Sequence, residues 1–191
     1  MVLDAGDLVT ATPSHRASAA AQALGEAELA RWCADLLTGA LDLTEQDRHD
    51  PLWIAGKAWT GWGDPRSWKR RGLDHWPRVW AARTLLHAWH PVAAPALEVG
   101  PRDPAWRVRE MSAKVVARYE VGPAAPACAD CAEEDAVPRV RTAALRALAV
   151  VGEIEHAPTV LACLAHEDPA VVRAAERAVE RMEARLDRPV P

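Results

Sequence analysis

Apolar residues recur at helical spacing along most of this chain. The clearest pattern lies between residues 137 and 151, where valine, alanine and leucine occupy positions i, i+3, i+4 and i+7. These positions are Val140, Ala143, Ala144, Leu145, Leu148 and Val151. They predict an amphipathic helix that stops at Gly152. A second helix is predicted after it, and its apolar residues are Val160, Leu161, Cys163 and Leu164. Because every apolar pattern of useful length has this spacing, we expect an all-α protein with no sheet.

The pattern repeats along the chain at a nearly constant distance. Three segments align without gaps on a valine, and these valines, Val108, Val140 and Val172, are 32 residues apart each time. A fourth copy, at Val79, lies 29 residues earlier. An aspartate precedes each valine by four or five residues, and these are Asp74, Asp103, Asp135 and Asp168. An Ala-Pro pair also recurs, at residues 94–95, 125–126 and 157–158. Proline suits the first turn of a helix, where its missing N–H costs nothing.

Each repeat therefore predicts a helix capped by aspartate, a short turn and a second helix begun by proline. One such pair cannot bury both of its apolar faces, so neighbouring pairs must stack into an α-solenoid. The segments at residues 168–175 and 140–148 carry Asp, Val-Arg and a small Ala pair, and in this they resemble HEAT repeats. The resemblance implies a right-handed α-solenoid with about four HEAT-like repeats over residues 72–191. It also implies that first helices lie on the convex side and second helices line a concave face.

The first repeat departs from the pattern, because Trp80 stands where the other three have arginine. Those arginines are Arg109, Arg141 and Arg173. In HEAT-like stacks such Asp and Arg residues lie at turns between repeats and bond across to the next one. We therefore interpret these residues as structural. The line of arginines is not interpreted as a phosphate-binding ladder.

Residues 1–71 lack this repeat, and we interpret them as an atypical N-terminal part of a single domain that spans residues 1–191. Residues 1–14 are expected to fray, and residues 15–71 to form a helical N-terminal cap. One helix is predicted from about Ser18 or Glu26 through Leu41. Another is predicted from Pro51 to Trp59, followed by a break at residues 61–65.

The composition gives indoles an unusual share of the core. The chain has 191 residues with no Phe, one Tyr and nine Trp, so several tryptophans must serve as core filler. No stretch reaches the roughly 18 apolar residues of a membrane helix, and the N-terminus lacks the basic start and apolar run of a signal peptide. We therefore expect a cytoplasmic protein with no membrane partner, whose four cysteines are reduced and buried.

Charge is unevenly distributed along the chain, although the formal net charge is only −4. Residues 1–56 carry −6, residues 57–118 carry +7 and residues 119–191 carry −5. The basic middle also holds seven of the nine tryptophans. Trp and Arg together are typical of binding hot spots, and local charge rather than net charge governs attraction of an anionic partner. The candidate binding residues are Trp62, Trp68, Lys69, Arg70, Arg71, Trp76, Arg78 and Arg107.

Two interpretations of these tryptophans stay open at this point. Trp62, Trp68 and Trp76 neighbour glycine, proline and charged residues, so each of them can be exposed or can fill the core. Trp89 falls on an apolar helical face and is expected in the core, whereas Trp80 lies just off that face and is left open.

Motifs that would indicate catalysis or a cofactor do not occur. The sequence has no Walker loop, GxGxxG, HExxH or GxSxG, and we expect no catalytic residue, no cofactor and no bound metal. Cys128 and Cys131 are three residues apart without a second such pair, which favours a helix face over a zinc site. His87 and His90 share this spacing and are interpreted as solvated or capping residues.

The function expected from these features is that of a non-enzymatic scaffold or adaptor. It would bind a protein or peptide through the concave face and the Trp/Arg-rich segment, as HEAT-like stacks mostly do. The alternative is nucleic-acid binding or DNA repair, because the HEAT-like alkylpurine DNA glycosylases hold DNA in a basic groove lined with aromatic residues. No residue here matches their catalytic aspartate. A HEAT-like lyase, or an adaptor for a cofactor-bearing protein, is a third class that no residue of the sequence selects.

Overall fold

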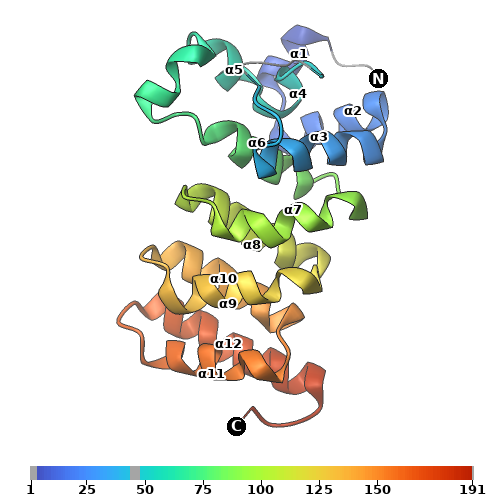
Figure 1. Cartoon of the computed structure of the whole chain (residues 1–191). Coiled ribbons are helices and arrows are strands. Elements are labelled where there is room, and N and C mark those ends of the chain that lie inside the picture. Colours follow the sequence, from blue (N-terminus) through green and yellow to red (C-terminus); the bar gives the residue numbers. More distant parts are fainter. Residues whose placement is uncertain (1–3, 44–47, 191) are drawn as a thin grey trace. The chain divides into compact units, whose positions relative to one another are not determined.

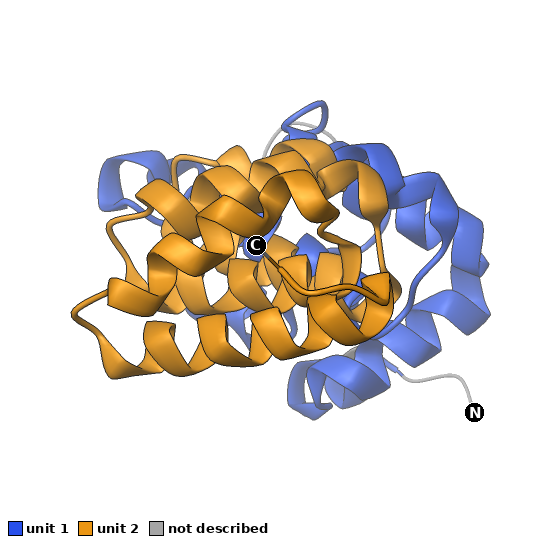
Figure 2. Cartoon of the chain, turned by 90° about the horizontal axis from the view of Figure 1, so that it is seen from below, with its two compact units in different colours: residues 1–96 blue, residues 97–191 orange. Residues whose placement is uncertain are grey.

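The computed structural model describes residues 4–43 and 48–190. Twelve α-helices and seven short 3-10 turns form this part of the chain, and no strand occurs in it, which confirms the all-α class. Residue contacts divide the chain into two compact units, residues 1–96 (unit 1) and residues 97–191 (unit 2), drawn in two colours in Figure 2. The single domain expected from the sequence stays a prediction.

Unit 2 is a stack of helix pairs in which a long first helix alternates with a shorter second helix (Figure 1). The central first helix, α10, packs against both α8 and α12, so the three first helices lie side by side. The second helices α9 and α11 also pack against each other. The bounds are α8 (Trp106–Tyr119), α9 (Ala125–Glu134), α10 (Pro138–Val151), α11 (Ala157–Ala162) and α12 (Pro169–Leu186). Helix α7 (Ala94–Val99) spans the boundary between the units in sequence.

The core of unit 2 follows the predicted apolar pattern. All six residues expected on the apolar face of α10 are buried, and Val140 and Leu148 have no exposed surface. Small alanines at the helix contacts let the backbones approach closely. A Cβ at Gly152 would lie 2.6 Å from the carbonyl oxygen of Leu148, so glycine permits the tight exit from α10. Leu164, expected on the second helix, lies instead in a 3-10 turn after α11 and is 38% exposed.

Unit 1 contains six shorter α-helices among the described residues. They are α1 (Ala5–Thr10), α2 (Pro13–Leu24), α3 (Glu26–Thr38), α4 (Leu52–Ala55), α5 (Lys57–Gly61) and α6 (Trp76–Leu85). Three 3-10 turns join them, η1 (Pro65–Ser67), η2 (Lys69–Arg71) and η3 (Pro91–Ala93). Helix α3 packs against α2 and α6, and α2 packs against α4, which places α3 and α6 in the centre of the unit.

The structure of unit 1 differs from the sequence expectation in three places. Of residues 1–14, which were expected to fray, residues 1–3 lie outside the described part; after Asp4 the segment is largely helical, and Asp4 caps α1 by accepting the N–H of Asp7 at 2.8 Å. Helix α3 ends three residues before the expected Leu41, because Gly39 adopts a left-handed conformation. The single helix expected over residues 51–59 is interrupted at Gly56, whose φ is +56°. The role of residues 15–71 as a cap stays a prediction.

None of the helices in the described part of the chain is both long enough and apolar enough to span a bilayer.

Candidate functional site

Asp135 joins two helix pairs of unit 2. Its carboxylate accepts hydrogen bonds from Arg109 Nε at 2.6 Å and from Arg109 Nη2 at 3.0 Å, which makes a bidentate ion pair. The same carboxylate accepts the backbone N–H of Val137, the residue just before α10, at 2.9 Å. Asp103 and Asp168 accept backbone N–H groups two residues ahead in the same way. These three aspartates therefore have a structural role, although only Asp168 is the N-cap of its helix. The expected cap at Asp74 is not formed, because α6 begins after His75 without a side-chain cap.

The repeated arginines are less alike than their spacing indicates. Arg141 does not reach the next repeat but donates to the carbonyl oxygens of Asp135, at 2.6 Å, and Ala132, at 3.0 Å. Arg173 is exposed on the last first helix and has no ion pair within the described residues. Only Arg109 of these three pairs with a carboxylate of the described chain. The arginines thus form no continuous anion-binding line.

The cysteine and histidine pairs singled out in the sequence also have structural surroundings. Cys128 and Cys131 are buried free thiols on α9, and burial raises the pKa of Cys131 to about 11. The Nδ1 atom of His90 accepts the N–H of Val92 at 3.2 Å and so caps η3, whereas His87 is exposed. Over residues 4–43 and 48–190, no group of three or more His, Cys, Asp or Glu side chains is placed to hold a metal ion.

Five tryptophans of unit 1 pack together, and we call them the indole cluster. Trp68 is its centre, with ring centroids 5.6 Å from Trp59 and from Trp80 and 6.1 Å from Trp62. Trp76 completes the cluster at 5.1 Å from Trp62. Most of these pairs are edge-to-face, the geometry that the indole quadrupole favours. Trp68 is 1% exposed, so it belongs to the core, and this corrects its placement among the candidate binding residues.

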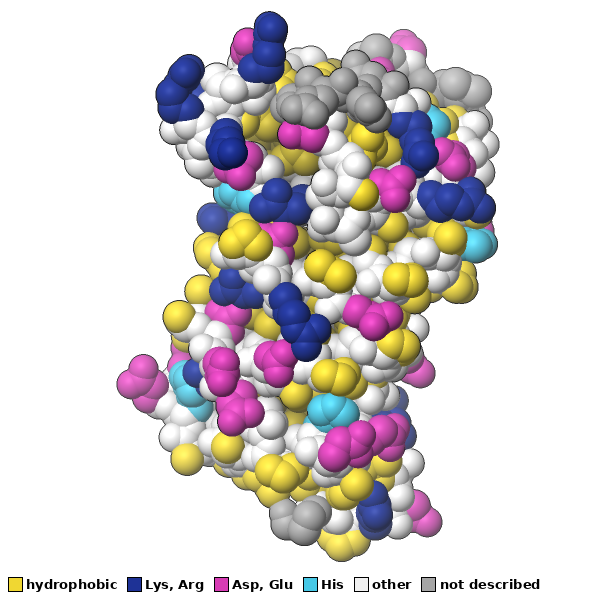
Figure 3. Space-filling model, in the orientation of Figure 1, with side chains coloured by type: hydrophobic (Ala, Val, Ile, Leu, Met, Phe, Trp, Pro, Cys, Tyr) yellow, Lys and Arg dark blue, Asp and Glu magenta, His cyan; other side chains and the backbone are white. Residues whose placement is uncertain are grey.

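The inward position of Trp68 leaves the three cations that follow it facing solvent. Lys69, Arg70 and Arg71 form the turn η2, and we call them the cationic turn. All three are exposed, and the side chains of Lys69 and Arg70 make no hydrogen bond or ion pair within the described residues. Arg71 Nη1 donates to the carbonyl oxygen of Trp62 at 2.5 Å. In Figure 3, separate Lys and Arg side chains stand out from the surface at the upper left, over the segment between α5 and α6.

The remaining candidate residues divide between the two units. Trp62, Trp76 and Arg78 are half-buried in unit 1. Trp62 and Trp76 belong to the indole cluster, and Trp62 also contacts the cationic turn through its hydrogen bond with Arg71. Arg107 lies in unit 2, on α8, with its guanidinium 4.3 Å from the ring centroid of Trp106. Two further expectations concern tryptophans outside this set. Trp80, left open in the sequence, is buried at 1% exposure, and Trp89, expected in the core, is half-buried.

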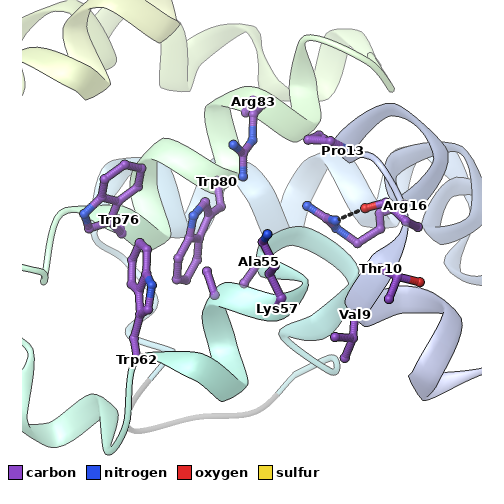
Figure 4. Close-up of a pocket in the computed structure, with 12 residues that line it drawn as sticks. Val9, Thr10, Pro13, Arg16, Ala55, Lys57, Trp62, Trp76, Trp80 and Arg83 are labelled. Atoms are coloured by element: carbon purple, nitrogen blue, oxygen red, sulfur yellow. Dashed lines mark hydrogen bonds between the residues drawn. The ribbon is translucent and has the colours of Figure 1, made fainter.

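Unit 1 also holds a cavity of about 590 Å³ that the sequence did not reveal. Figure 4 shows three indoles at one end of it, those of Trp62, Trp76 and Trp80, and two arginines beside them, Arg16 and Arg83. Arg16 is 5% exposed, and its Nε atom is buried with no hydrogen-bond partner among the described residues. The Nε atom of Arg83 is also buried and has no hydrogen-bond partner among the described residues.

Of these two arginines, only Arg83 could have been identified from the sequence as a candidate. Helix α6 is apolar on nearly every side, with seven of its ten residues buried, and a cation inside such a helix is unusual. Arg83 could have been singled out on this ground. Arg16 could not, because it lies in a polar stretch of α2, far from its partners in sequence.

Comparison with known proteins identifies only the C-terminal part of the chain. The family model for HEAT repeats matches residues 94–180, from the start of α7 into α12. No curated protein and no solved structure matched the chain. The stacked helix pairs and this match agree, and residues 94–180 match the HEAT-repeat family.

Proposed function

We propose that the protein is a non-enzymatic interaction module, a scaffold or adaptor that acts in the cytoplasm and binds a protein or peptide. HEAT repeats over residues 94–180 support this class, because stacked repeats present extended surfaces that bind partners. In this proposal the helix pairs form a right-handed solenoid whose second helices line the concave face. Residues 15–71 cap one of its ends.

The observation that carries the proposal is the solvent-facing cationic turn beside half-exposed indoles. Trp62 and Trp76 supply aromatic area, and Lys69 and Arg70 supply charge that no described residue of the chain neutralises. Aromatic and Arg side chains dominate the energy of protein interfaces. An acidic segment with apolar side chains is the partner that this combination of groups fits.

The second helices offer another kind of surface. Their exposed residues include acidic side chains, which in α9 are Asp130, Glu133 and Glu134. Two large apolar residues are also exposed there: Val99, at the end of α7, is 51% exposed, and Leu164, in the turn after α11, is 38% exposed. Such a surface favours a basic, amphipathic partner segment over a polyanion. This supports a protein partner over nucleic acid for the concave face.

Charge along the chain also favours a protein over a long nucleic acid. The cationic turn lies in the segment of +7, but the flanking segments carry −6 and −5 and would repel a polyanion that extends past the basic middle. Nucleic-acid binding is therefore the second candidate, supported by the exposed cations themselves.

An affinity capture with matched variants tests the proposal. The whole chain is immobilised, and bound proteins are identified before and after nuclease treatment. The test variant replaces Lys69, Arg70 and Arg71 by alanine. The control variant replaces Arg173, Arg177 and Arg181, which are exposed on α12, and so removes the same charge from another surface.

We expect one partner protein that stays bound after nuclease treatment. It should bind the control variant and should not bind the test variant. Release of all bound protein by nuclease, or equal loss from both variants, would contradict it.

A further inference from the structure

The cavity of unit 1 contains positive charge that the described chain does not neutralise. Arg16, Lys57 and Arg83 line it, and no Asp or Glu is among the described residues that do so. Neither arginine makes an ion pair within residues 4–43 and 48–190. Burial of a cation without a counterion is unfavourable, and it persists only where the fold or a ligand compensates for it.

The fold holds Arg16 in this unfavourable place. One guanidinium nitrogen, Nη1, donates to the carbonyl oxygen of Ala11. The guanidinium lies against Gly56, where a Cβ would be 2.5 Å from Nη1 and 2.7 Å from Cζ. Glycine at this break between α4 and α5 therefore leaves the space that the guanidinium occupies. The bond to Ala11 still leaves Nε, and the charge itself, without a partner.

Arg83 reaches the same cavity from α6. Burial lowers the pKa of Arg83, and the nearby positive charge of Arg16 lowers it further. Burial also lowers the pKa of Arg16. The two positively charged guanidinium groups thus repel each other. An anion between them would relieve both the desolvation and the repulsion.

The other end of the cavity is aromatic. The ring centroids of Trp62 and Trp80 are 5.4 Å apart with the planes tilted by 42°, and that of Trp76 is 5.1 Å from Trp62. Figure 4 shows Arg83 and Lys57 between these indoles and Arg16. A volume of about 590 Å³ is in the range of pockets that hold small molecules. The cavity therefore combines a flat apolar wall with three cations.

We propose that this cavity binds a phosphate monoester joined to a planar ring, with the phosphate on Arg16, Arg83 and Lys57 and the ring against the indoles. Three cations match a group of charge near −2 better than a carboxylate of charge −1. Guanidinium groups bind phosphate through paired N–H donors, and aromatic rings pack on indoles. A nucleotide and a phosphotyrosine side chain share this chemistry.

This proposal goes beyond the interaction function. It shares Trp62 and Trp76 with that function, but its three cations are not those of the cationic turn. Calorimetric titration of the whole chain tests it with four probes: adenosine 5′-monophosphate, phosphotyrosine, adenosine and inorganic phosphate. Binding of either ring phosphate, at least about tenfold tighter than adenosine and inorganic phosphate, is the expected result. The tighter of the two ring phosphates then identifies the source.

Variants distinguish a binding role from a structural one. Arg16→Met and Arg83→Met keep the aliphatic stem and are expected to weaken binding about tenfold or more, because each removes charge-assisted hydrogen bonds. Each is also expected to raise the melting temperature of the ligand-free protein or leave it unchanged, since an unpaired buried charge is removed. Arg70→Met, at an exposed cation outside the cavity, is the control and leaves binding unchanged.

Three results would overturn the proposal. They are no binding of either ring phosphate below a dissociation constant of about 1 mM, equal affinity for inorganic phosphate, and unchanged affinity in both cavity variants. A failure to capture any partner protein would contradict the interaction function without changing these titrations. The two proposals can therefore be contradicted independently.

Discussion

Replacement of Asp135 by alanine removes three interactions at once. The carboxylate accepts two hydrogen bonds from Arg109, at 2.6 and 3.0 Å, and one from the N–H of Val137, at 2.9 Å. The Asp135 side chain is 3% exposed and that of Arg109 is 19% exposed, so the ion pair is largely shielded from water. Asp135 is the carboxylate with which Arg109 forms its ion pair among the described residues, so the variant removes that pair.

The size of the effect follows from these contacts. Loss of the hydrogen bond to the N–H of Val137 costs about 1 kcal/mol. Breaking a buried ion pair from one side costs about 3 to 5 kcal/mol. The second figure is an upper bound here, because Arg109 is partly exposed and keeps its bonds to the carbonyl oxygens of Asp103 and Pro104, at 2.9 and 3.0 Å. We therefore expect Asp135→Ala to lower the free energy of unfolding of unit 2 by about 3 kcal/mol.

Asp168 provides a matched control for this measurement. It is the repeated aspartate of the next repeat, one residue closer to its valine than Asp135 is, and it caps α12 through the N–H of Ala170 at 2.7 Å. It has no ion pair within the described chain. Asp168→Ala is expected to cost only about 1 kcal/mol. Urea unfolding followed by circular dichroism measures both losses, and hydrogen exchange of residues 138–151 assigns them to unit 2. Equal losses in the two variants would refute the stabilising role of the Arg109 pair.

Two further predictions concern the cores of the two units. Leu148→Asp places an unpaired carboxylate where the side chain has no exposed surface, and it is expected to destabilise the stack by several kcal/mol, about 3 or more; a melting temperature close to that of the original chain would show that the helix register is wrong. Trp68→Ala empties the centre of the indole cluster and is expected to cost about 3 to 5 kcal/mol. Lys69→Ala next to it is expected to change stability by under about 0.5 kcal/mol, and a similar loss in both would place Trp68 outside the core.

The repeats of unit 2 could be predicted because their determinants are local. The aspartate before the helix, such as Asp135, an apolar residue such as Val140 and a stop such as Gly152 lie within a few turns of one another, and helical spacing relates them directly. The HEAT repeats were therefore evident from the sequence. Leu164 was misplaced because the helix ends two residues before it, and helix boundaries depend on small differences in local energy.

The cavity of unit 1 could not be predicted because its residues come from separate helices. Arg16 lies on α2, Lys57 on α5 and Arg83 on α6, and no spacing rule relates them. Trp68 was misread for a related reason. Its neighbours in sequence are charged, but η2 turns its indole inward and its neighbours outward, which only the tertiary packing decides.

The most direct test of the interaction function is the salt dependence of binding at the cationic turn. Affinity for the captured partner protein is measured by titration over a range of salt concentrations, with the original chain and with Trp76→Ala, and duplex DNA is titrated in parallel. A protein interface predicts a loss of about 2 kcal/mol in Trp76→Ala and only mild salt dependence. Micromolar or tighter binding of duplex DNA at physiological salt, steeply weakened by added salt and lost when Lys69, Arg70 and Arg71 are replaced by alanine, would contradict the account.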